Sequence, residues 1–220
     1  MIGSAAMLLW FDIVPEHIAE HDEWHTREHF PERIGIPGFL RAERWIARDQ
    51  SSPRYFVRYE VRDLEVLTSP AYLARLNDPT PWTRRMMSHY RGMARGFCSI
   101  EHRDGEVVGT ELLTLRFGTD PVGRQALTEW LARTCLPEIA RRRGIADTLK
   151  LRATVPPPMT SEQRIRGSDA PLADVVLVSG YAGESVDEIC LGDLSVSTLQ
   201  GRGAVNVACG RYHLACCAEA

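Results

Sequence analysis

The first hundred residues switch between a two-residue and a helical hydrophobic period. Pro15 suits the first turn of a helix, and the dipeptide Pro37-Gly38 breaks the chain before the next strand. The string DPTP interrupts the second helical stretch. The predicted elements, in the order βαββαβ, are strands at 6–14, 39–48, 54–62 and 93–102, and helices at 15–34 and 64–90.

The second half of the chain repeats this order. A strand at LLTLRFG is followed by a helix, two strands, a weaker helix and a last strand. A Pro-rich loop, near 155–173, is inserted between the second and third strands of this half. The predicted elements are a helix near 121–143, strands near 147–155 and 174–182, a helix near 184–200 and a strand near 205–215.

Two ten-residue segments support a duplication. EWHTREHFPE at 23–32 aligns without gaps on EWLARTCLPE at 129–138, with five identities that include a tryptophan and a proline. Both segments occupy the same place in their βαββαβ pattern, which indicates an internal repeat. The predicted domains are a first ferredoxin-like repeat, 1–104, and a second, degenerate repeat, 105–220.

A βαββαβ unit forms a four-stranded antiparallel sheet with two helices on one face. In strand 6–14 the odd-numbered side chains are apolar, whereas the even-numbered positions include Trp10 and Asp12. Similar mixed faces occur in the next two strands. The predicted fold is therefore α+β, with two sheets packed through these mixed faces around a cavity lined by aromatic and charged groups.

The stretch EWHTREHFPERIGIPGFLRAERW, with SPAYLARLNDPTPWTRRM further on, resembles the dimeric α/β-barrel superfamily, particularly EthD-like and related uncharacterised proteins. Members carry a similar helix end followed by a P-G turn into the second strand. The resemblance implies a barrel closed by dimerisation, so the tandem repeat is expected as a monomeric pseudo-dimer or a homodimer. It also implies small-molecule chemistry of the lactone isomerase, polyketide cyclase, cofactor-independent monooxygenase or haem peroxidase kind.

Four histidines follow one another at four-residue spacing: His17, His21, His25 and His29. The first two share their helix with many acidic residues, and we expect them on a solvated face. His25 and His29 align with Leu131 and Cys135 of the second repeat, which predicts a protected setting in which an imidazole needs a partner and its pKa can move. A satisfied core histidine is the alternative.

The string HTREH also fits the inverted zinc-protease signature H-x-x-E-H. The match is short, no third ligand is identifiable, and Pro31 is expected to end or kink the helix almost at once. We therefore predict no metal site and no cofactor; a divalent metal or haem is the less favoured alternative.

By strand parity, several chemically useful residues are expected to face the cavity. His29 is the candidate general base, and His25 or Asp12 would orient it. Arg41 or Arg58 would stabilise enolate-like charge on the substrate. Cross-strand ion pairs are the structural alternative for the charged residues. The complete substrate-binding prediction is Trp10, Arg41, Trp45, Arg58 and Tyr59.

Composition and net charge limit the kinds of partner that we expect. The 220 residues carry a formal net charge of −3, which gives no reason to expect nucleic acid or an anionic membrane as a partner. The N-terminus has no basic segment, and Asp12 cuts its apolar run, so we expect a cytoplasmic protein without a membrane span. The six cysteines form no C-x-x-C pair and predict reduced thiols.

The predicted function is an enzyme that binds an anionic or carbonyl-bearing organic substrate, aromatic or aliphatic, and moves a proton through histidine. An isomerase, a cyclase or a cofactor-independent monooxygenase would each fit. A non-catalytic ligand-binding or stress-related barrel is the alternative, because a fold of this kind does not by itself determine a reaction.

Overall fold

The computed structural model describes residues 2–49, 51, 53–155, 159–167 and 169–220, and it confirms the predicted α+β class. The strands lie in the order β1-β3-β2-β8-β5-β7-β6-β4 of a closed barrel, to which one chain supplies all eight strands. The elements of the first half are β1 (Ala5–Ile13), α1 (Ile18–Trp24), α2 (Phe30–Ile34), β2 (Phe39–Ala47), β3 (Tyr55–Val61), α3 (Pro70–Asn77), α4 (Pro81–Met87) and β4 (Tyr90–Asp104).

The second half repeats the same order with one addition. An extra short helix, α7 (Ser161–Arg166), lies within the predicted Pro-rich loop, of which residues 156–158 and 168 are outside the described part. The other elements are β5 (Glu111–Thr119), α5 (Arg124–Trp130), α6 (Leu136–Ala140), β6 (Ile145–Ala153), β7 (Asp174–Gly180), α8 (Gly183–Leu191), α9 (Val196–Gln200) and β8 (Ala204–Glu219).

The chain divides into two compact units that differ from the predicted domains. The first unit consists of 1–99, 154–171 and 215–220, and the second of 100–153 and 172–214. The predicted boundary at 104/105 falls close to the first division. The segment that carries α7, however, belongs to the first unit although it comes from the second half of the sequence.

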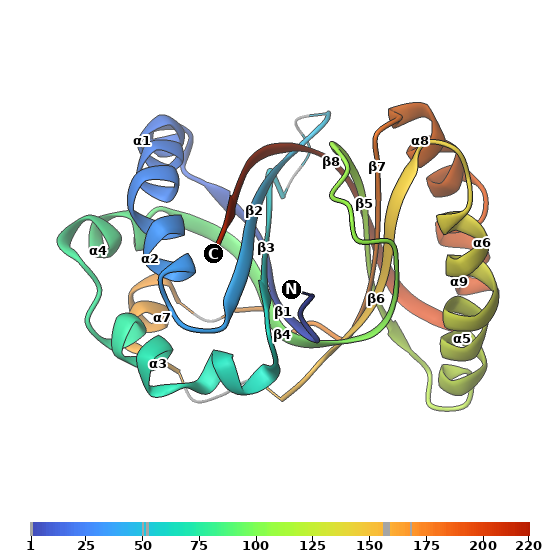
Figure 1. The fold of residues 1–220 in the computed structure, drawn as a ribbon, viewed down its shortest axis with the longest axis horizontal. Coiled ribbons are helices and arrows are strands. Elements are labelled where there is room, and N and C mark those ends of the chain that lie inside the picture. Colours follow the sequence, from blue (N-terminus) through green and yellow to red (C-terminus); the bar gives the residue numbers. More distant parts are fainter. Residues whose placement is uncertain (1, 50, 52, 156–158, 168) are drawn as a thin grey trace. The chain divides into compact units, whose positions relative to one another are not determined.

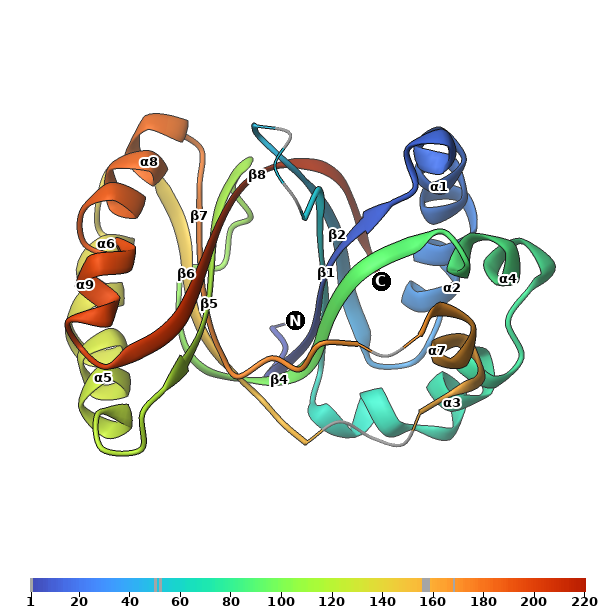
Figure 2. The same cartoon turned by 180° about the vertical axis from the view of Figure 1, so that it is seen from behind.

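In each unit the helices cover one face of the sheet (Figures 1 and 2). In the first unit β1 pairs antiparallel with both β3 and β4, and β3 pairs with β2. The helices α1, α2, α3, α4 and α7 lie on the same face of this sheet, and α5, α6, α8 and α9 cover one face in the second unit. Residues of alternate parity along each strand therefore face either the helices or the opposite side.

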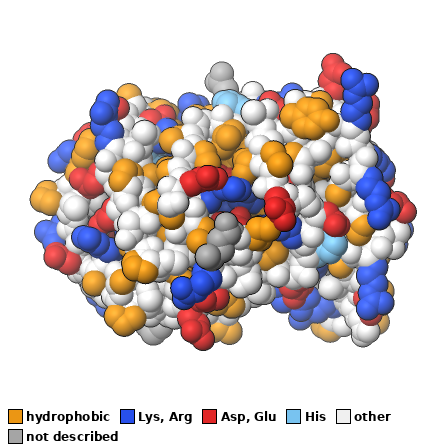
Figure 3. Space-filling view, viewed as in Figure 1, with side chains coloured by type: hydrophobic (Ala, Val, Ile, Leu, Met, Phe, Trp, Pro, Cys, Tyr) orange, Lys and Arg blue, Asp and Glu red, His pale blue; other side chains and the backbone are white. Residues whose placement is uncertain are grey.

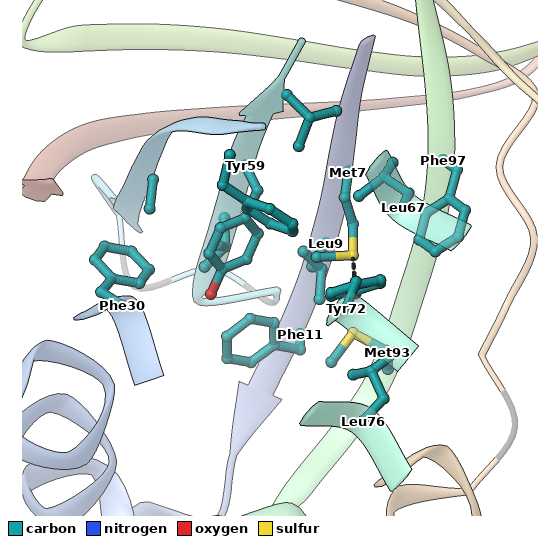
Figure 4. Packing of buried hydrophobic residues seen from close by; sticks show 14 of the residues in the cluster. Met7, Leu9, Phe11, Phe30, Tyr59, Leu67, Tyr72, Leu76, Met93 and Phe97 are labelled. Atoms are coloured by element: carbon teal, nitrogen blue, oxygen red, sulfur yellow. Dashed lines mark hydrogen bonds between the residues drawn. The ribbon is translucent and has the colours of Figure 1, made fainter. Parts of the chain in front are cut away.

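The helix-facing side of the first sheet carries the core of its unit (Figure 4). Met7, Leu9 and Phe11 of β1 pack there with Tyr59 of β3, as the alternation predicted. The hydroxyl of Tyr72, from α3, donates to the sulfur of Met7 over 3.2 Å. Each large apolar side chain buried in this way stabilises the fold by roughly 1.5–3 kcal/mol.

The first long helix contains a π turn, which the sequence did not predict. His25–His29 forms five residues of π-helix between α1 and α2, and Leu131–Cys135 forms the same turn between α5 and α6. Each π turn is followed, after one residue, by a proline: Pro31 or Pro137. The wide turn changes the hydrogen-bond register where the proline has no N–H, and the helix continues to Ile34. The prediction was that Pro31 ends or kinks the helix almost at once, and the helix ends three residues after it.

On the face seen in Figure 3, basic and acidic side chains are interspersed. Among the helices in the described part of the chain, none has the length and apolar character needed to cross a bilayer. The cytoplasmic location stays a prediction.

Candidate active site

Three histidines form a column on the first long helix. The rings of His21 and His25 lie 5.1 Å apart between centroids with their planes 20° from parallel. The rings of His25 and His29 are 5.3 Å apart at 22°. The π turn keeps this row on one face, because a normal α-helix drifts by about 40° with every four residues.

The column is buried. His25 and His29 are 2% and 6% exposed, as their alignment with apolar residues predicted. His21 is fully buried, so its predicted place on a solvated face is wrong. The reason is that Phe11, Tyr55 and Tyr90 surround its ring on the helix-facing side of the sheet.

Burial sets the protonation of these histidines. It holds the pKa of His25 and of His29 well below the usual value of 6.5, and nearby cations, Arg33 for His29, lower it further. Burial also lowers the pKa of His21, although hydrogen bonding to Asp22 opposes this. The imidazoles of His25 and His29 are therefore neutral at physiological pH, which is the state that a general base requires.

The hydrogen bonds of the column differ along its length. His21 Nδ1 lies 3.2 Å from the Asp22 carboxylate, and its Nε2 lies 3.3 Å from the Tyr90 hydroxyl. His25 Nε2 lies 3.3 Å from the hydroxyl of Tyr59, and burial raises the pKa of that tyrosine well above 10, so the hydroxyl donates. The Nδ1 atoms of His25 and His29 are buried without a hydrogen-bond partner among the described residues.

A small cavity lies beside the column, within the first unit. Its volume is about 20 Å³, enough for one water molecule. His25, His29 and Tyr59 line it together with the sheet residues Met7, Leu9 and Phe11. Its remaining polar lining comes from Arg33, Arg95, Glu162, Gln163 and Arg166.

Helix α7 forms one wall of this cavity. It contributes Glu162, Gln163 and Arg166, and it packs against α3 and α4. Arg33 Nη2 donates to Glu162 Oε2 over 2.8 Å, and both side chains are buried. Arg166 bonds through its guanidinium to Asp169, whose carboxylate also lies 3.8 Å from Arg95.

The structure brings together only part of the predicted site. His25, His29 and Tyr59 line one cavity, whereas Trp10 and Arg58 alternate with its lining residues and belong to the opposite face of the sheet. Arg58 donates two hydrogen bonds to the buried carboxylate of Glu43, at 2.6 and 3.0 Å. This cross-strand pairing is the structural alternative raised for these charged residues.

The other predicted residues share that opposite face or its edge. Trp45 Nε1 donates to Glu43 over 3.0 Å, and the Trp10 ring packs on Phe56 at 4.5 Å. Arg41 pairs with Glu219 at 2.8 Å. The carboxylate of Asp12 accepts a hydrogen bond from the backbone N–H of Arg54 over 2.7 Å. The single site predicted from strand parity therefore does not form as one cluster.

The absence of a metal or cofactor stays a prediction. No group of three or more metal-ligating side chains occurs in the part of the chain that the structure describes. A cavity of about 20 Å³ is also far below the 300 Å³ or more typical of organic-cofactor pockets. A haem does not fit beside His29 in this conformation.

Sequence reasoning missed three sets of residues. Arg33 follows His29 by four positions, and this helical spacing could have identified it. Glu162 and Arg166 lie about 130 residues away in a loop without a regular pattern, and only the fold brings them to the site. Cys190 and Cys209, with sulfurs 3.3 Å apart, were missed for the same reason.

Comparisons with solved structures show the fold over nearly the whole chain. An anthrone oxidase-like protein aligns with a TM-score of 0.69 at 10% identity, covering 98% of this chain and 92% of that one. A candidate monooxygenase from Fusobacterium nucleatum aligns at 0.65 with 6% identity, covering 100% and 96%. A mutant chlorite dismutase from Candidatus Nitrospira defluvii aligns at 0.56 with 13% identity, covering 96% and 92%.

Neither a family model nor a curated protein sequence matches the chain. The structural likeness confirms the predicted α+β barrel fold. Identities of 6–13% carry the fold and not the reaction. The closer EthD-like resemblance stays a prediction.

Proposed function

We propose that the protein is an enzyme that removes a proton from a small organic substrate, with His29 as the general base. The proposal rests on two buried, neutral imidazoles, those of His25 and His29. Both side chains line the cavity, and the Nδ1 atom of each has no hydrogen-bond partner among the described residues. A structural histidine in a core has its ring nitrogens satisfied, as those of His21 are.

The surrounding groups have complementary roles. The Tyr59 hydroxyl donates to His25 Nε2 and so fixes the tautomer and orientation of that ring. Arg33, Arg95 and Arg166 surround the cavity with positive charge, which would stabilise an enolate or phenolate as it forms. These arginines replace Arg41 and Arg58 of the sequence-based scheme, which lie in ion pairs on β2 and β3.

The cavity must enlarge before a substrate can enter. Organic ligands occupy roughly 300–1,000 Å³, whereas the present cavity holds about 20 Å³. Helix α7 lies in the connection between β6 and β7, and its movement would open the cavity on the side of Tyr90. A neighbouring surface hollow of about 390 Å³ is lined in part by Tyr90 and Arg166. A closed α7 would then keep water from the reacting carbanion.

The chemistry named for the structural neighbours fits this arrangement. An anthrone is a carbonyl compound with an activated C–H group, and its oxidation begins with loss of that proton. Deprotonated anthrone takes up one O₂, and the overall reaction yields one anthraquinone and one water. We therefore propose a cofactor-independent oxidase or monooxygenase type first, and an isomerase or cyclase second, with a small molecule as the only partner needed.

The test uses anthrone and a panel of enolisable aromatic ketones and keto acids. We expect the purified chain to accelerate exchange of the acidic C–H in D₂O, followed by NMR, and O₂ uptake with anthrone. His29→Gln should reduce both rates by at least 100-fold, since a general base contributes about 10²–10⁴-fold. His89→Gln, at a surface histidine stacked on His17, is the matched control and should keep full activity.

Three results would contradict the proposal in different ways. A fully active His29→Gln variant would exclude the base. Saturable binding of panel compounds without exchange or O₂ uptake would favour the ligand-binding alternative. Activity that depends on added metal, or a Soret band in the purified protein, would favour a metal or haem enzyme.

A further inference from the structure

Arg33 is the cation best placed to receive a substrate anion. It lies on α2, four residues after His29, and is 1% exposed. Side chains at this spacing project from one face of a helix about 5–6 Å apart. Its planar guanidinium can bind a carboxylate through two parallel hydrogen bonds.

In the present structure Arg33 already forms an ion pair with a carboxylate. Glu162 of α7 accepts from Arg33 Nη2 over 2.8 Å, and Glu162 is 4% exposed. Burying this ion pair carries a large desolvation penalty, whereas apolar side chains of similar size would fill the same space without that penalty. The second acid of the segment, Asp169, lies in the same way against Arg95 and Arg166.

Movement of α7 would change the charge around the cavity. Glu162 would leave Arg33, and Asp169 would leave Arg95, so that two cations would face the open space next to His29. Of the acids within reach, Glu32 would remain near Arg33, at 3.4 Å. The opened site would therefore have a net requirement for an anion.

We propose that Arg33 binds the carboxylate of the substrate and that Glu162 takes its place when the site is empty. This inference rests on the proposed function and adds a substrate class: a small aromatic or enolisable carboxylic acid. The helical spacing sets its geometry, since the carboxylate and the carbon that loses its proton would lie about 5–6 Å apart, as across an aromatic ring.

The test measures binding of benzoate, and of its neutral analogue benzamide, by isothermal titration calorimetry with the full chain. Glu162→Gln removes the competing charge and keeps the size of the side chain. We expect it to raise the affinity for benzoate about tenfold and to leave benzamide unchanged. Arg33→Met should abolish the preference for benzoate, whereas Arg27→Met, at an exposed arginine of the same helical segment, should keep it.

A double variant covers the case in which Arg33→Met fails to fold. Arg33→Met/Glu162→Met replaces the buried pair by apolar groups of similar length, a change that proteins often tolerate. The proposal is overturned if this variant or Arg33→Met still prefers benzoate, or if Glu162→Gln changes both ligands equally or leaves benzoate affinity unchanged. Binding in a His29→Gln background separates the two proposals, because Arg33-dependent benzoate binding does not need the base.

A second inference concerns the second unit and does not depend on the first. Cys190 of α8 and Cys209 of β8 have their sulfur atoms 3.3 Å apart. Cys209 is exposed and Cys190 is partly buried. A disulfide requires about 2.05 Å, so a small rotation of the side chains would bring the two sulfurs to bonding distance.

The pair also has the electrostatics of a reactive dithiol. The hydrogen bond from Cys209, with a smaller contribution from the charge of Arg211, outweighs burial and lowers the pKa of Cys190 to about 7. A thiolate at neutral pH is the form that attacks disulfides. The remaining cysteines include Cys98, which is buried, and the vicinal Cys216 and Cys217.

We infer that Cys190 and Cys209 form a reversible disulfide by exchange with small-molecule disulfides such as oxidised glutathione. The Cys190 thiolate attacks one sulfur of glutathione disulfide and releases one glutathione thiolate. Cys209, losing its proton, then attacks the Cys190 sulfur and releases the second glutathione. The net change is two protein thiols oxidised and one glutathione disulfide reduced to two thiols.

Intact-mass and peptide mass spectrometry test this inference after incubation with oxidised glutathione. We expect loss of two hydrogens from the chain and a 190–209 cross-linked peptide, reversed by dithiothreitol. Cys209→Ser should trap glutathione on Cys190, and Cys216→Ser should behave as the unmodified chain. A cross-link between other cysteines, or two thiols at 190 and 209 that stay fully alkylatable, would overturn the inference.

Discussion

The first long helices of the two halves have one backbone and opposite chemistry. His25–His29 and Leu131–Cys135 are both π turns, 106 residues apart, each followed by the same X-Pro-Glu string. Extended by one turn each way, the alignment pairs four buried polar residues with four buried apolar ones. The pairs are His21 with Leu127, His25 with Leu131, His29 with Cys135 and Arg33 with Ile139.

The tyrosines of the sheet beneath the first helix are also replaced by apolar residues in the second half. Met7 pairs with Tyr59 in the first half, and its counterpart Leu113 pairs with Val178 in the second. Ile13 pairs with Tyr90, whereas Thr119 pairs with Ala204. The second half therefore shows that this backbone, including its π turns, needs no polar group here. The polar column of the first half is an addition, which is what a functional site would require and a structural one would not.

The most severe change makes Arg33 like its counterpart. Arg33→Ile leaves the carboxylate of Glu162 buried without its guanidinium. We expect the free energy of unfolding to fall by about 3–5 kcal/mol, as for other broken buried ion pairs. Urea unfolding followed by circular dichroism measures it. Arg33→Ile/Glu162→Leu should recover most of the loss, and a double variant as unstable as the single one would show that the pairing is not the cause.

The reverse exchange introduces the polar group into the second half. Leu131→His places an imidazole at a fully buried position that offers apolar neighbours such as Leu127 and Leu136. Losing the leucine and burying an unpartnered N–H together should reduce stability by about 3 kcal/mol. Thermal unfolding measures this loss. A well-tolerated histidine at 131 would mean that the core of the second half accepts polar groups as readily as the core of the first half.

Acid should destabilise the protein through the buried histidines of the first half. The pKa of His25 and of His29 lies well below 6.5 in the fold, so the unfolded chain binds more protons once the pH drops below about 6.5. Stability therefore falls with falling pH, by about 1.4 kcal/mol for each of these histidines at about pH 5.5. Unfolding curves between pH 7.5 and about 5.5 measure the slope. His25→Leu/His29→Cys, which copies the second half, should reduce the slope and leave the part that comes from His21, and an unchanged slope would assign it to other groups.

The element order and the helix-facing core could be predicted because both follow from periodicity. Met7, Leu9 and Phe11 alternate with Leu8 and Trp10, and the pattern alone fixes which set faces the helices. The same parity placed Arg58 and Trp10 on the opposite face, and the structure agrees. The mistake was to expect His29 on that face too, since a helix packed on one side of a sheet directs its buried side chains to the side it covers.

Other parts of the site depend on contacts that no local pattern contains. His21 has acidic neighbours in sequence, which favoured a solvated face, but Tyr55 and Tyr90 arrive from strands far along the chain. Glu162 comes from a Pro-rich loop that the sequence presents only as an insertion. The π turn arises from an Xaa-Pro string that ordinarily predicts a helix break.

The smallest expected effect separates function from structure most directly. His29→Cys copies Cys135 and removes a ring whose Nδ1 has no partner among the described residues, so the lost packing and the relieved polar burial should nearly cancel. We expect a change in unfolding free energy below about 1 kcal/mol, measured beside His21→Leu. The latter leaves the buried hydroxyl of Tyr90 without this partner and removes one of the hydrogen bonds to the Asp22 carboxylate, and should cost about 1–3 kcal/mol. A loss above about 2 kcal/mol for His29→Cys would make His29 a core histidine like His21.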